Sequence, residues 1–201
     1  MISGCVGPQD DRYSPASKLT AAAARDYHAA QISTFSDTAA DMVTAITMTY
    51  ADEAIGLALA AEQHELPAVI SFTVETDGRL PSGQPLGAAV SQVDGETGGA
   101  PAYYMINCAH PTHFDDVLSE HEAWHDRIRG LRANASTKSH AELDEATELD
   151  MGDPADLGRR YAGLRAKLPE LNVLGGCCGT DHRHVAEVCK AWLAGSAASG
   201  T

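Results

Sequence analysis

The residues best suited to chemistry are two adjacent cysteines, Cys177 and Cys178, within the run Gly-Gly-Cys-Cys-Gly-Thr at 175–180. A strand-like run at 171–174 predicts a strand before them, and apolar residues at helical spacing from Val185 onward predict a helix after them. The cysteine pair therefore falls on a strand-to-helix turn. The flanking glycines allow a sharp bend there and let a ligand approach the backbone closely.

Adjacent thiols of this kind have two ordinary uses. One is a vicinal disulfide, although neighbouring cysteines bridge only with strain. The other is a site for a soft metal, and two thiolates from one turn then need a further ligand from elsewhere in the chain.

Cys108 is the candidate for that further ligand. It follows the run 103–107, which reads as a second buried strand. The carboxyl ends of the strands of a parallel α/β barrel meet on the face where active sites are built, so both cysteine sites would lie there. Three thiolates would hold Zn²⁺ and leave its fourth position open, as catalytic zinc requires.

Length and composition narrow the class of protein. The 201 residues suffice for one domain with a sizeable core. A net charge of −14 makes a nucleic-acid backbone an unfavourable partner. We expect no signal peptide and no membrane span, because the chain lacks an apolar run of sufficient length. The 5 cysteines lack the spacing of a disulfide-rich secreted domain, so reduced thiols in the cytoplasm fit better.

The elements that must position the cysteines alternate along the chain. Strands are expected at 1–7, 41–47, 68–74, 103–108 and 171–174, with a run of weak strand propensity at 130–135. Helices are expected at 19–36, anchored by Tyr27 and Phe35, and at 51–65, 86–93, 118–129, 153–168 and 185–192. An acidic flap or loop, with a capping box at Ser139 and Glu142, is expected before the sixth strand. Six alternations predict an α/β fold with a parallel sheet and crossover helices.

The two cysteine motifs together resemble those of a known family. Ile-Asn-Cys at 106–108, followed by Pro111 and by the run 175–180, resembles the zinc-dependent homocysteine S-methyltransferases. The resemblance extends from residues 4–8 to the helix after Cys178, and it places a strand at 130–135. It implies a (β/α)8 TIM-barrel type of fold.

Compared with the family, this chain would supply an incomplete barrel. Residues 1–194 would form about six βα units, strands 3–8 of the barrel, and 195–201 would form a flexible C-terminal tail. The missing two units would precede Met1. Either the natural protein is longer, or a second copy covers the open sheet edges, and we expect a homo-oligomer because open edges of buried strands expose apolar side chains.

The resemblance also implies an activity, a zinc-dependent transfer of a methyl group to the thiol of homocysteine, which gives methionine. Cys108, Cys177 and Cys178 would hold the Zn²⁺, and coordination would activate the thiol as a nucleophile. The donor would be a sulfonium or ammonium compound such as S-methylmethionine, S-adenosylmethionine or betaine. The alternative is a zinc-binding fragment or module of the same fold without turnover. A third interpretation is a redox protein with a reversible Cys177–Cys178 disulfide.

Binding of the substrate's amino group needs an acidic partner. The family has a Glu-Thr-like pair at the strand end that reads Ala-Ile-Thr here, so Ile46 stands at the acidic position, beside Thr47. We predict that Glu75, at the end of the next strand, takes over; the alternative is a solvated loop carboxylate. Thr47, Asn107 and Asn134 complete the candidates for substrate binding, although strand-end asparagines are often turn residues.

Other potential ligands are weaker candidates. His110 and His113 follow Cys108 in a Cys-x-His-x-x-His pattern that could form a ligand cluster. We favour loop histidines, because the family-like site is complete with three cysteines. Cys5 has no partner spacing and is expected in the core.

Overall fold

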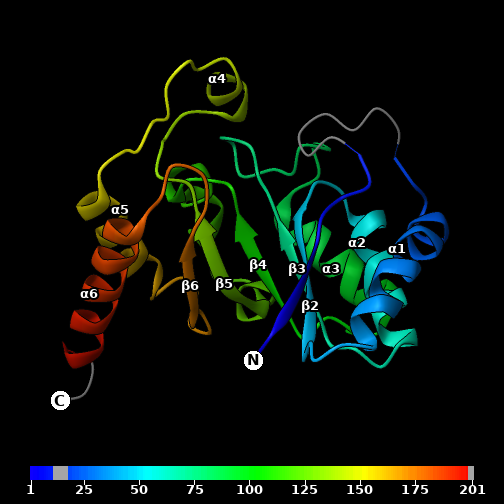
Figure 1. Cartoon of the computed structure of the whole chain (residues 1–201). Helices are drawn as coiled ribbons and strands as arrows, with labels where there is room; N and C mark the ends of the chain where they lie inside the picture. Colours follow the sequence, from blue (N-terminus) through cyan, green and yellow to red (C-terminus); the bar gives the residue numbers. More distant parts are fainter. Residues whose placement is uncertain (11–17, 199–201) are drawn as a thin grey trace. The chain divides into compact units, whose positions relative to one another are not determined.

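The computed structural model describes residues 1–10 and 18–198, which fall into two compact units (Figure 1). The first unit comprises Met1–Thr73 and Arg79–Met105, and the second comprises Val74–Gly78 and the chain from Ile106 onward. The strand β4 (Tyr103–Asn107) contributes residues to both units.

The first unit is a parallel sheet layered with helices. Its strands follow one another in sequence order, and Ser3 of β1 pairs with Met42 of β2, while Val43 of β2 pairs with Ala68 of β3. The elements are β1 (Ser3–Val6), α1 (Ala21–Ser36), β2 (Met42–Met48), α2 (Ala51–Gln63), β3 (Ala68–Phe72), α3 (Leu86–Thr97) and the first residues of β4. All residues of β3 are buried, as expected for a strand covered on both faces.

Helices α1 and α2 cross closely in the first unit. The Thr20 side chain accepts a hydrogen bond from Ala23 N–H and so caps the start of α1. A Cβ atom on Gly56 of α2 would lie 2.5 Å from the backbone of Ala21, so only glycine allows this approach. Ala24, His28 and Ile32, four residues apart, form the buried face of α1.

The second unit continues the same architecture. Its strands are ordered β4, β5, β6, and β5 and β6 are parallel with Gly130 opposite Val173. The elements after β4 are three short 3₁₀ helices, η1 (Pro111–His113), η2 (Asp116–Leu118) and η3 (Ala123–Arg127), then β5 (Ile128–Ala133), α4 (His140–Asp144), α5 (Pro154–Leu164), β6 (Val173–Gly176) and α6 (His182–Ala198). In the described chain β1 pairs only with β2, and β6 only with β5, so each has an open edge.

Helix α5 begins and packs as its sequence predicts. Asp153 Oδ1 accepts hydrogen bonds from Ala155 N–H at 2.8 Å and Asp156 N–H at 3.3 Å, and Pro154 occupies the first turn. The predicted stripe is buried throughout: Leu157, Tyr161, Leu164 and Leu168. The capping box of Ser139 and Glu142 is also confirmed, at the start of α4.

The helix predicted at 118–129 is wrong. Glu122 has an extended backbone, with φ −124° and ψ 154°, and its side chain caps a new turn in which His125 bonds back to Glu122 N–H. The chain is thus re-capped inside the predicted helix, and separate 3₁₀ turns form in its place.

Two further predictions, on Tyr27 and Cys5, need correction. Tyr27 is 54% exposed and does not anchor α1, because the buried face of that helix lies at His28 and its neighbours one turn away. Cys5 is exposed, because burial alternates along β1 and falls on Gly4 and Val6. Helix α6 runs to Ala198, so 195–198 are helical, while 199–201 lie outside the described residues. The division at 194 stays a prediction.

Candidate metal centre

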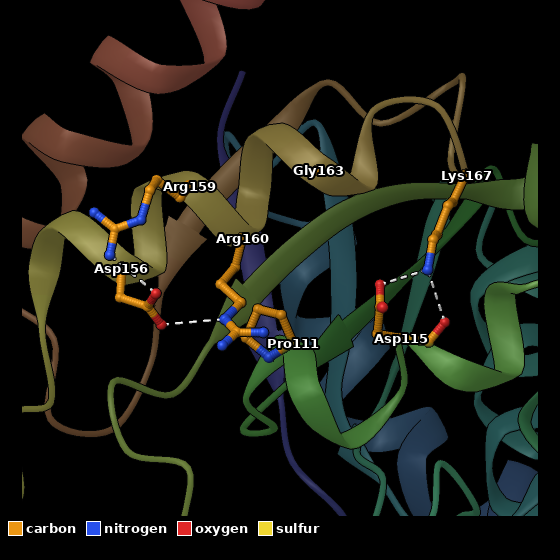
Figure 2. Close-up of a pocket in the computed structure, with 7 residues that line it drawn as sticks. All are labelled: Pro111, Asp115, Asp156, Arg159, Arg160, Gly163 and Lys167. Atoms are coloured by element: carbon orange, nitrogen blue, oxygen red, sulfur yellow. Dashed lines mark hydrogen bonds and ion pairs between the residues drawn. The ribbon is translucent and has the colours of Figure 1, made fainter.

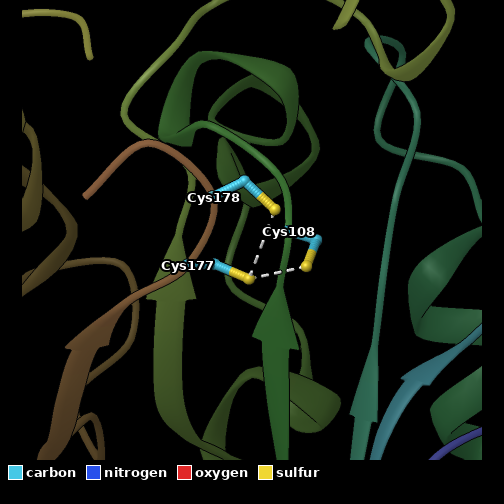
Figure 3. A group of neighbouring side chains, drawn as sticks. All are labelled: Cys108, Cys177 and Cys178. Carbon is cyan, nitrogen blue, oxygen red and sulfur yellow. Dashed lines mark hydrogen bonds between the residues drawn. The ribbon is translucent and has the colours of Figure 1, made fainter. Parts of the chain in front are cut away.

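Three cysteine side chains of the second unit converge from two turns (Figure 3). Cys108 directly follows β4, and Cys177 and Cys178 directly follow β6. The Sγ atoms of Cys108 and Cys177 are 2.6 Å apart, those of Cys177 and Cys178 are 4.0 Å apart, and all three lie within 4.8 Å of one another. This is the group predicted from the sequence, and its closest pair joins two turns rather than the two adjacent cysteines.

The three sulfurs differ in their access to solvent. Cys108 is buried, Cys177 is half-buried and Cys178 is exposed. The contact of Cys177 with the Cys108 thiol, and then with Cys178, raises the pKa of the Cys177 thiol. The cluster is therefore closed by protein on the Cys108 side and open on the Cys178 side.

Both cysteine turns are held by the end of β5, which lies between them. On one side Cys108 N–H donates to Arg132 O at 3.1 Å. On the other side Cys177 N–H donates to Ala133 O at 2.8 Å, and Ala135 N–H donates to Cys178 O at 3.0 Å. Main-chain hydrogen bonds of the sheet thus continue past the strand ends and fix the backbone of both turns to one template.

Backbone conformation at the turns explains the glycines around the cysteine pair. Gly179 has φ +76°, and a Cβ there would lie 2.4 Å from Asp150 O, so a side chain has neither the conformation nor the space. The Thr180 hydroxyl donates to Cys177 O at 2.7 Å and closes the turn. Cys108 itself has φ +54°, an uncommon conformation for a residue with a side chain.

Asn134 lies between the two cysteine turns and bonds to both. Its Nδ2 donates to Cys108 O at 2.9 Å, and its Oδ1 accepts from Cys178 N–H at 3.1 Å. The side chain is 1% exposed. Both ends of the carboxamide are therefore bonded to the backbone of the cysteine turns, and contact with a substrate stays a prediction.

The remaining substrate candidates are distributed over both units. Asn107 is fully buried in the second unit, just before Cys108. Glu75 also belongs to the second unit; it is half-buried in a turn where Gly78 N–H donates to its carbonyl at 3.0 Å. Thr47 belongs to the first unit, is buried and has φ +62°. Substrate binding by these residues stays a prediction.

Both histidines after Cys108 lie at the short helix η1 and are buried. His110 Nδ1 accepts from Thr112 N–H at 3.3 Å, and burial lowers the pKa of His110 to about 4. His113 Nε2 donates to Thr137 O at 2.8 Å. Neither belongs to the group of potential metal ligands in the described residues, which consists of cysteines alone.

A cavity of about 350 Å³ lies against α5, and none of the cluster cysteines lines it (Figure 2). Its charged side chains pair with one another: Arg159 and Arg160 each lie 3.1 Å from Asp156, and Lys167 lies 2.7 Å from Asp115. The cavity is lined by Pro111, Asp115, Asp156, Arg159, Arg160, Gly163 and Lys167. Because its cations have carboxylate partners within the same wall, it is a weaker candidate for a functional site than the cysteine cluster.

Comparison with known proteins decides the family. The family model for homocysteine S-methyltransferase matches residues 1–192. The chain belongs to the homocysteine S-methyltransferase family. A search of curated proteins finds no match.

Solved structures similar to this family member include the homocysteine methyltransferase MmuM from Escherichia coli in two forms. The apo form has 20% sequence identity and a TM-score of 0.64, with 94% of this chain and 61% of MmuM covered. The metallated form has 20% identity and a TM-score of 0.66, with 96% and 60% covered. The chain thus spans about three fifths of the length of MmuM. The likeness confirms the predicted fold, an α/β fold that forms part of a TIM-type barrel.

The described residues also bear on membrane insertion. None of their helices combines the length and the apolar character needed to cross a bilayer.

Proposed function

We propose that the chain carries the zinc-binding, thiol-activating site of a homocysteine S-methyltransferase. The observation that supports this most is the convergence of Cys108, Cys177 and Cys178 from the ends of β4 and β6. Family membership supplies the reaction class, the transfer of a methyl group to homocysteine with methionine as product.

The donor set fits zinc. Thiolates are soft ligands that select Zn²⁺, Cu⁺ or iron–sulfur clusters over Mg²⁺ or Ca²⁺. Zn–S bonds of about 2.3 Å in a tetrahedron place sulfurs about 3.8 Å apart. The sulfur separations here, from 2.6 Å up to within 4.8 Å, bracket that value. Three protein thiolates also leave one position for a substrate thiol.

The chain's own residues would do the following in the reaction. The two turns hold three thiolates at one point, and the exposed side of Cys178 leaves an approach for the substrate thiol. Glu75 would hold the substrate's ammonium group by a charge-assisted hydrogen bond, and Asn107, Asn134 and Thr47 are further substrate candidates. Bound zinc would lower the pKa of the substrate thiol, so that the nucleophilic thiolate forms near neutral pH.

The chemical step is a displacement at a methyl carbon. The substrate's thiolate forms a new sulfur–carbon bond, while the bond from that methyl to the donor's sulfonium sulfur or ammonium nitrogen breaks. The electron pair of the broken bond stays on the donor, which leaves as a neutral thioether or amine. The thiol's proton passes to solvent. In-line positioning of the two substrates would supply much of the rate.

A zinc-binding module without turnover is the second candidate. The observation that favours it is that Ile46 stands at the family's acidic position. Zinc content and methionine formation from homocysteine, measured with S-methylmethionine, S-adenosylmethionine and betaine in turn, separate the two. Zinc with turnover supports the enzyme; zinc without turnover supports the module; absence of metal contradicts both.

We also propose that a second copy covers an open strand edge. β1 and β6 each pair with one neighbour in the described chain, and Ile2 and Val173 beside these edges are 59% and 39% exposed. Unpaired strand edges that carry apolar side chains favour pairing with another chain. Light scattering after size exclusion tests this; a monomeric mass at micromolar concentration would contradict it. Reduced thiol ligands fit a cytoplasmic location.

A further inference from the structure

We propose that Asn134 is a positioning residue that sets the separation of the two cysteine turns and thereby the geometry of the metal site. The proposal rests on the proposed function, because it concerns the same three cysteines. Its basis is the pair of hydrogen bonds from one carboxamide to the backbone of Cys108 and of Cys178.

The orientation of the carboxamide is fixed by its partners. Cys178 N–H can only donate, so it must face Oδ1, and Cys108 O can only accept, so it must face Nδ2. A carboxylate would keep the first bond and lose the second. An aliphatic side chain of similar size would lose both. Asparagine is therefore the side chain that satisfies both turns.

The main-chain hydrogen bonds of the sheet do not reach every polar group of the two cysteine turns. They fix Cys108 N–H, Cys177 N–H and Cys178 O to the end of β5. Of the three main-chain groups that remain, Cys177 O accepts from the Thr180 hydroxyl. The carboxamide binds the other two, the carbonyl of Cys108 and the N–H of Cys178. Cys108 has a left-handed backbone, and the bond to its carbonyl stabilises that conformation, which directs Sγ toward the other two sulfurs.

Burial makes this connection sensitive to substitution. Asn134 is 1% exposed, so water cannot readily replace a lost bond. A change at Asn134 should therefore alter the relative position of the turns that carry the sulfurs. Groups that orient metal ligands typically affect metal affinity about 10–100-fold when mutated.

The first test measures Co²⁺ binding by the full chain, with Co²⁺ as a spectroscopic substitute for zinc. Asn134→Asp and Asn134→Leu should bind about 10–100-fold more weakly than wild type, with altered thiolate-to-cobalt charge-transfer and ligand-field bands. Asn134→Asp should retain more affinity, because it keeps the acceptor for Cys178 N–H. Leu164→Ala is the matched control. Leu164 is buried in α5, so its replacement should destabilise the fold, but its side chain makes no hydrogen bond to either cysteine turn.

The spectra and affinities decide between positioning and general stability. If Asn134→Asp and Asn134→Leu bind Co²⁺ with the wild-type affinity and spectrum, the proposal is wrong. It is also wrong if Leu164→Ala weakens binding as much and changes the spectrum in the same way. If wild-type protein binds no metal, the proposed function fails, and a second test of positioning is still decisive.

That second test needs no metal. In a Cys178→Ser background, phenylarsine oxide, which bridges two thiols, must join Cys108 to Cys177 across the two turns, and mass spectrometry of the digested adduct confirms the bridged pair. The backbone N–H of residue 178 remains available to Asn134 in this background. Adding Asn134→Leu should lower the arsenical's affinity about tenfold or more if Asn134 fixes the separation, by analogy with other groups that orient ligands. Equal affinity in the two proteins would overturn the proposal.

Discussion

Three buried polar side chains of the first unit form a cluster through hydrogen bonds to one another and to nearby backbone. His28 Nε2 lies 3.1 Å from Glu53 Oε1, and both side chains are 1% exposed. The same carboxylate oxygen accepts from Gln9 N–H at 2.6 Å. Next to this pair, the Tyr50 hydroxyl accepts from Leu19 N–H, and burial raises the pKa of Tyr50 to about 12. We call His28, Glu53 and Tyr50 the first-unit cluster.

The cysteine cluster of the second unit is arranged differently. There the backbone groups are bonded to β5 and to Asn134, whereas the sulfurs face one another and one side is open. A cluster whose polar side chains point at one another and at nearby backbone contributes to stability. In the cysteine cluster the sulfur atoms converge on one point, and the hydrogen bonds are made by the main chain instead. Such an arrangement leaves the sulfurs available to bind a metal ion. Burial alone therefore does not indicate function; the direction of the donor atoms does.

The largest expected effect is the loss of metal binding on replacing a cluster cysteine. Cys108→Ser, Cys177→Ser and Cys178→Ser should each remove most of the zinc, because each removes one thiolate from a three-thiolate site. Zinc per chain, measured by elemental analysis of purified reduced protein, is the readout. Wild type should carry one zinc per chain.

Two cysteines outside the cluster provide the controls. Cys5 and Cys189 are exposed, and neither belongs to the convergent group, so Cys5→Ser and Cys189→Ser should retain full zinc. Full zinc content in Cys108→Ser would show that the convergence seen in the structure is not the ligand set.

In the first-unit cluster, a substitution should lower stability and leave zinc binding unchanged. Glu53→Ala should lower the free energy of unfolding by about 3–5 kcal/mol, because it leaves the buried His28 ring and Gln9 N–H without this partner. Zinc per folded chain should not change. Urea denaturation gives the first quantity, and the exposed Glu62 of the same helix, changed to Ala, is the control. A change below about 1 kcal/mol for Glu53→Ala would contradict a stabilising role for the cluster.

A second carboxylate sharpens the contrast. Glu75→Gln should weaken homocysteine binding to the zinc-loaded protein by roughly 1.5–3 kcal/mol, because a charge-assisted hydrogen bond is lost, and should leave stability nearly unchanged. Titration calorimetry measures the binding. Asp77→Asn, at an exposed carboxylate in the same turn, is the control. Equal affinity for homocysteine in wild type and Glu75→Gln would remove Glu75 from the substrate site.

The sequence predicts five of the six strands and the cysteine turns well, for a physical reason; the remaining strand, β5, has weak strand propensity and is placed by the family resemblance. Strands such as β3 are buried on both faces, so their residues form nearly continuous apolar runs that are easy to recognise. The run at 175–180 combines glycines and cysteines, and both residue types have narrow uses at a turn. Helix α5 is equally clear, because Asp153 caps its start and its buried apolar residues recur at the spacing of an α-helix.

Predictions failed where the outcome depends on contacts that local sequence does not encode. The residues at 118–129 contain apolar positions, but Glu122 starts a new capped turn among them. Cys5 resembles a core residue, yet burial on β1 falls on Gly4 and Val6. Tyr27 is large and aromatic, but the buried face of α1 is chosen by the crossing with α2 at Gly56. The errors at Cys5 and Tyr27 concern which face a neighbour covers, whereas the error at 118–129 is a missed local cap.

The connection made by Asn134 was also beyond sequence reasoning. The sequence marks Asn134 as a strand-end candidate, but its two partners lie 26 and 44 residues away along the chain. Only the order of β4, β5 and β6 brings them to its two sides. The signal available was the position of Asn134 just after a strand that lies between the two cysteine-bearing strands.

The smallest effect is expected at Tyr161, which ties β5 to β6 just below the cysteine turn. Its buried hydroxyl accepts from Ala133 N–H at 2.9 Å and donates to Gly175 O at 2.7 Å. Tyr161→Phe keeps the ring in its place and removes both bonds, so it should cost roughly 1–2 kcal/mol of unfolding free energy. Urea denaturation measures the loss, with Tyr27→Phe, at an exposed tyrosine, expected within about 0.5 kcal/mol of wild type.

The same variant also shows how far the support of the metal site extends. The sulfurs are held by the turns, and Tyr161 bonds to the strands that precede those turns. Zinc affinity should therefore fall less in Tyr161→Phe than in the Asn134 variants. If it falls by the full 10–100-fold expected of a group that orients ligands, the strands themselves are part of the arrangement that fixes the sulfurs. Stabilising and ligand-directing groups would then both occur within the second unit, and each hydrogen bond near the cysteines would have to be tested for its effect on stability and on zinc affinity separately.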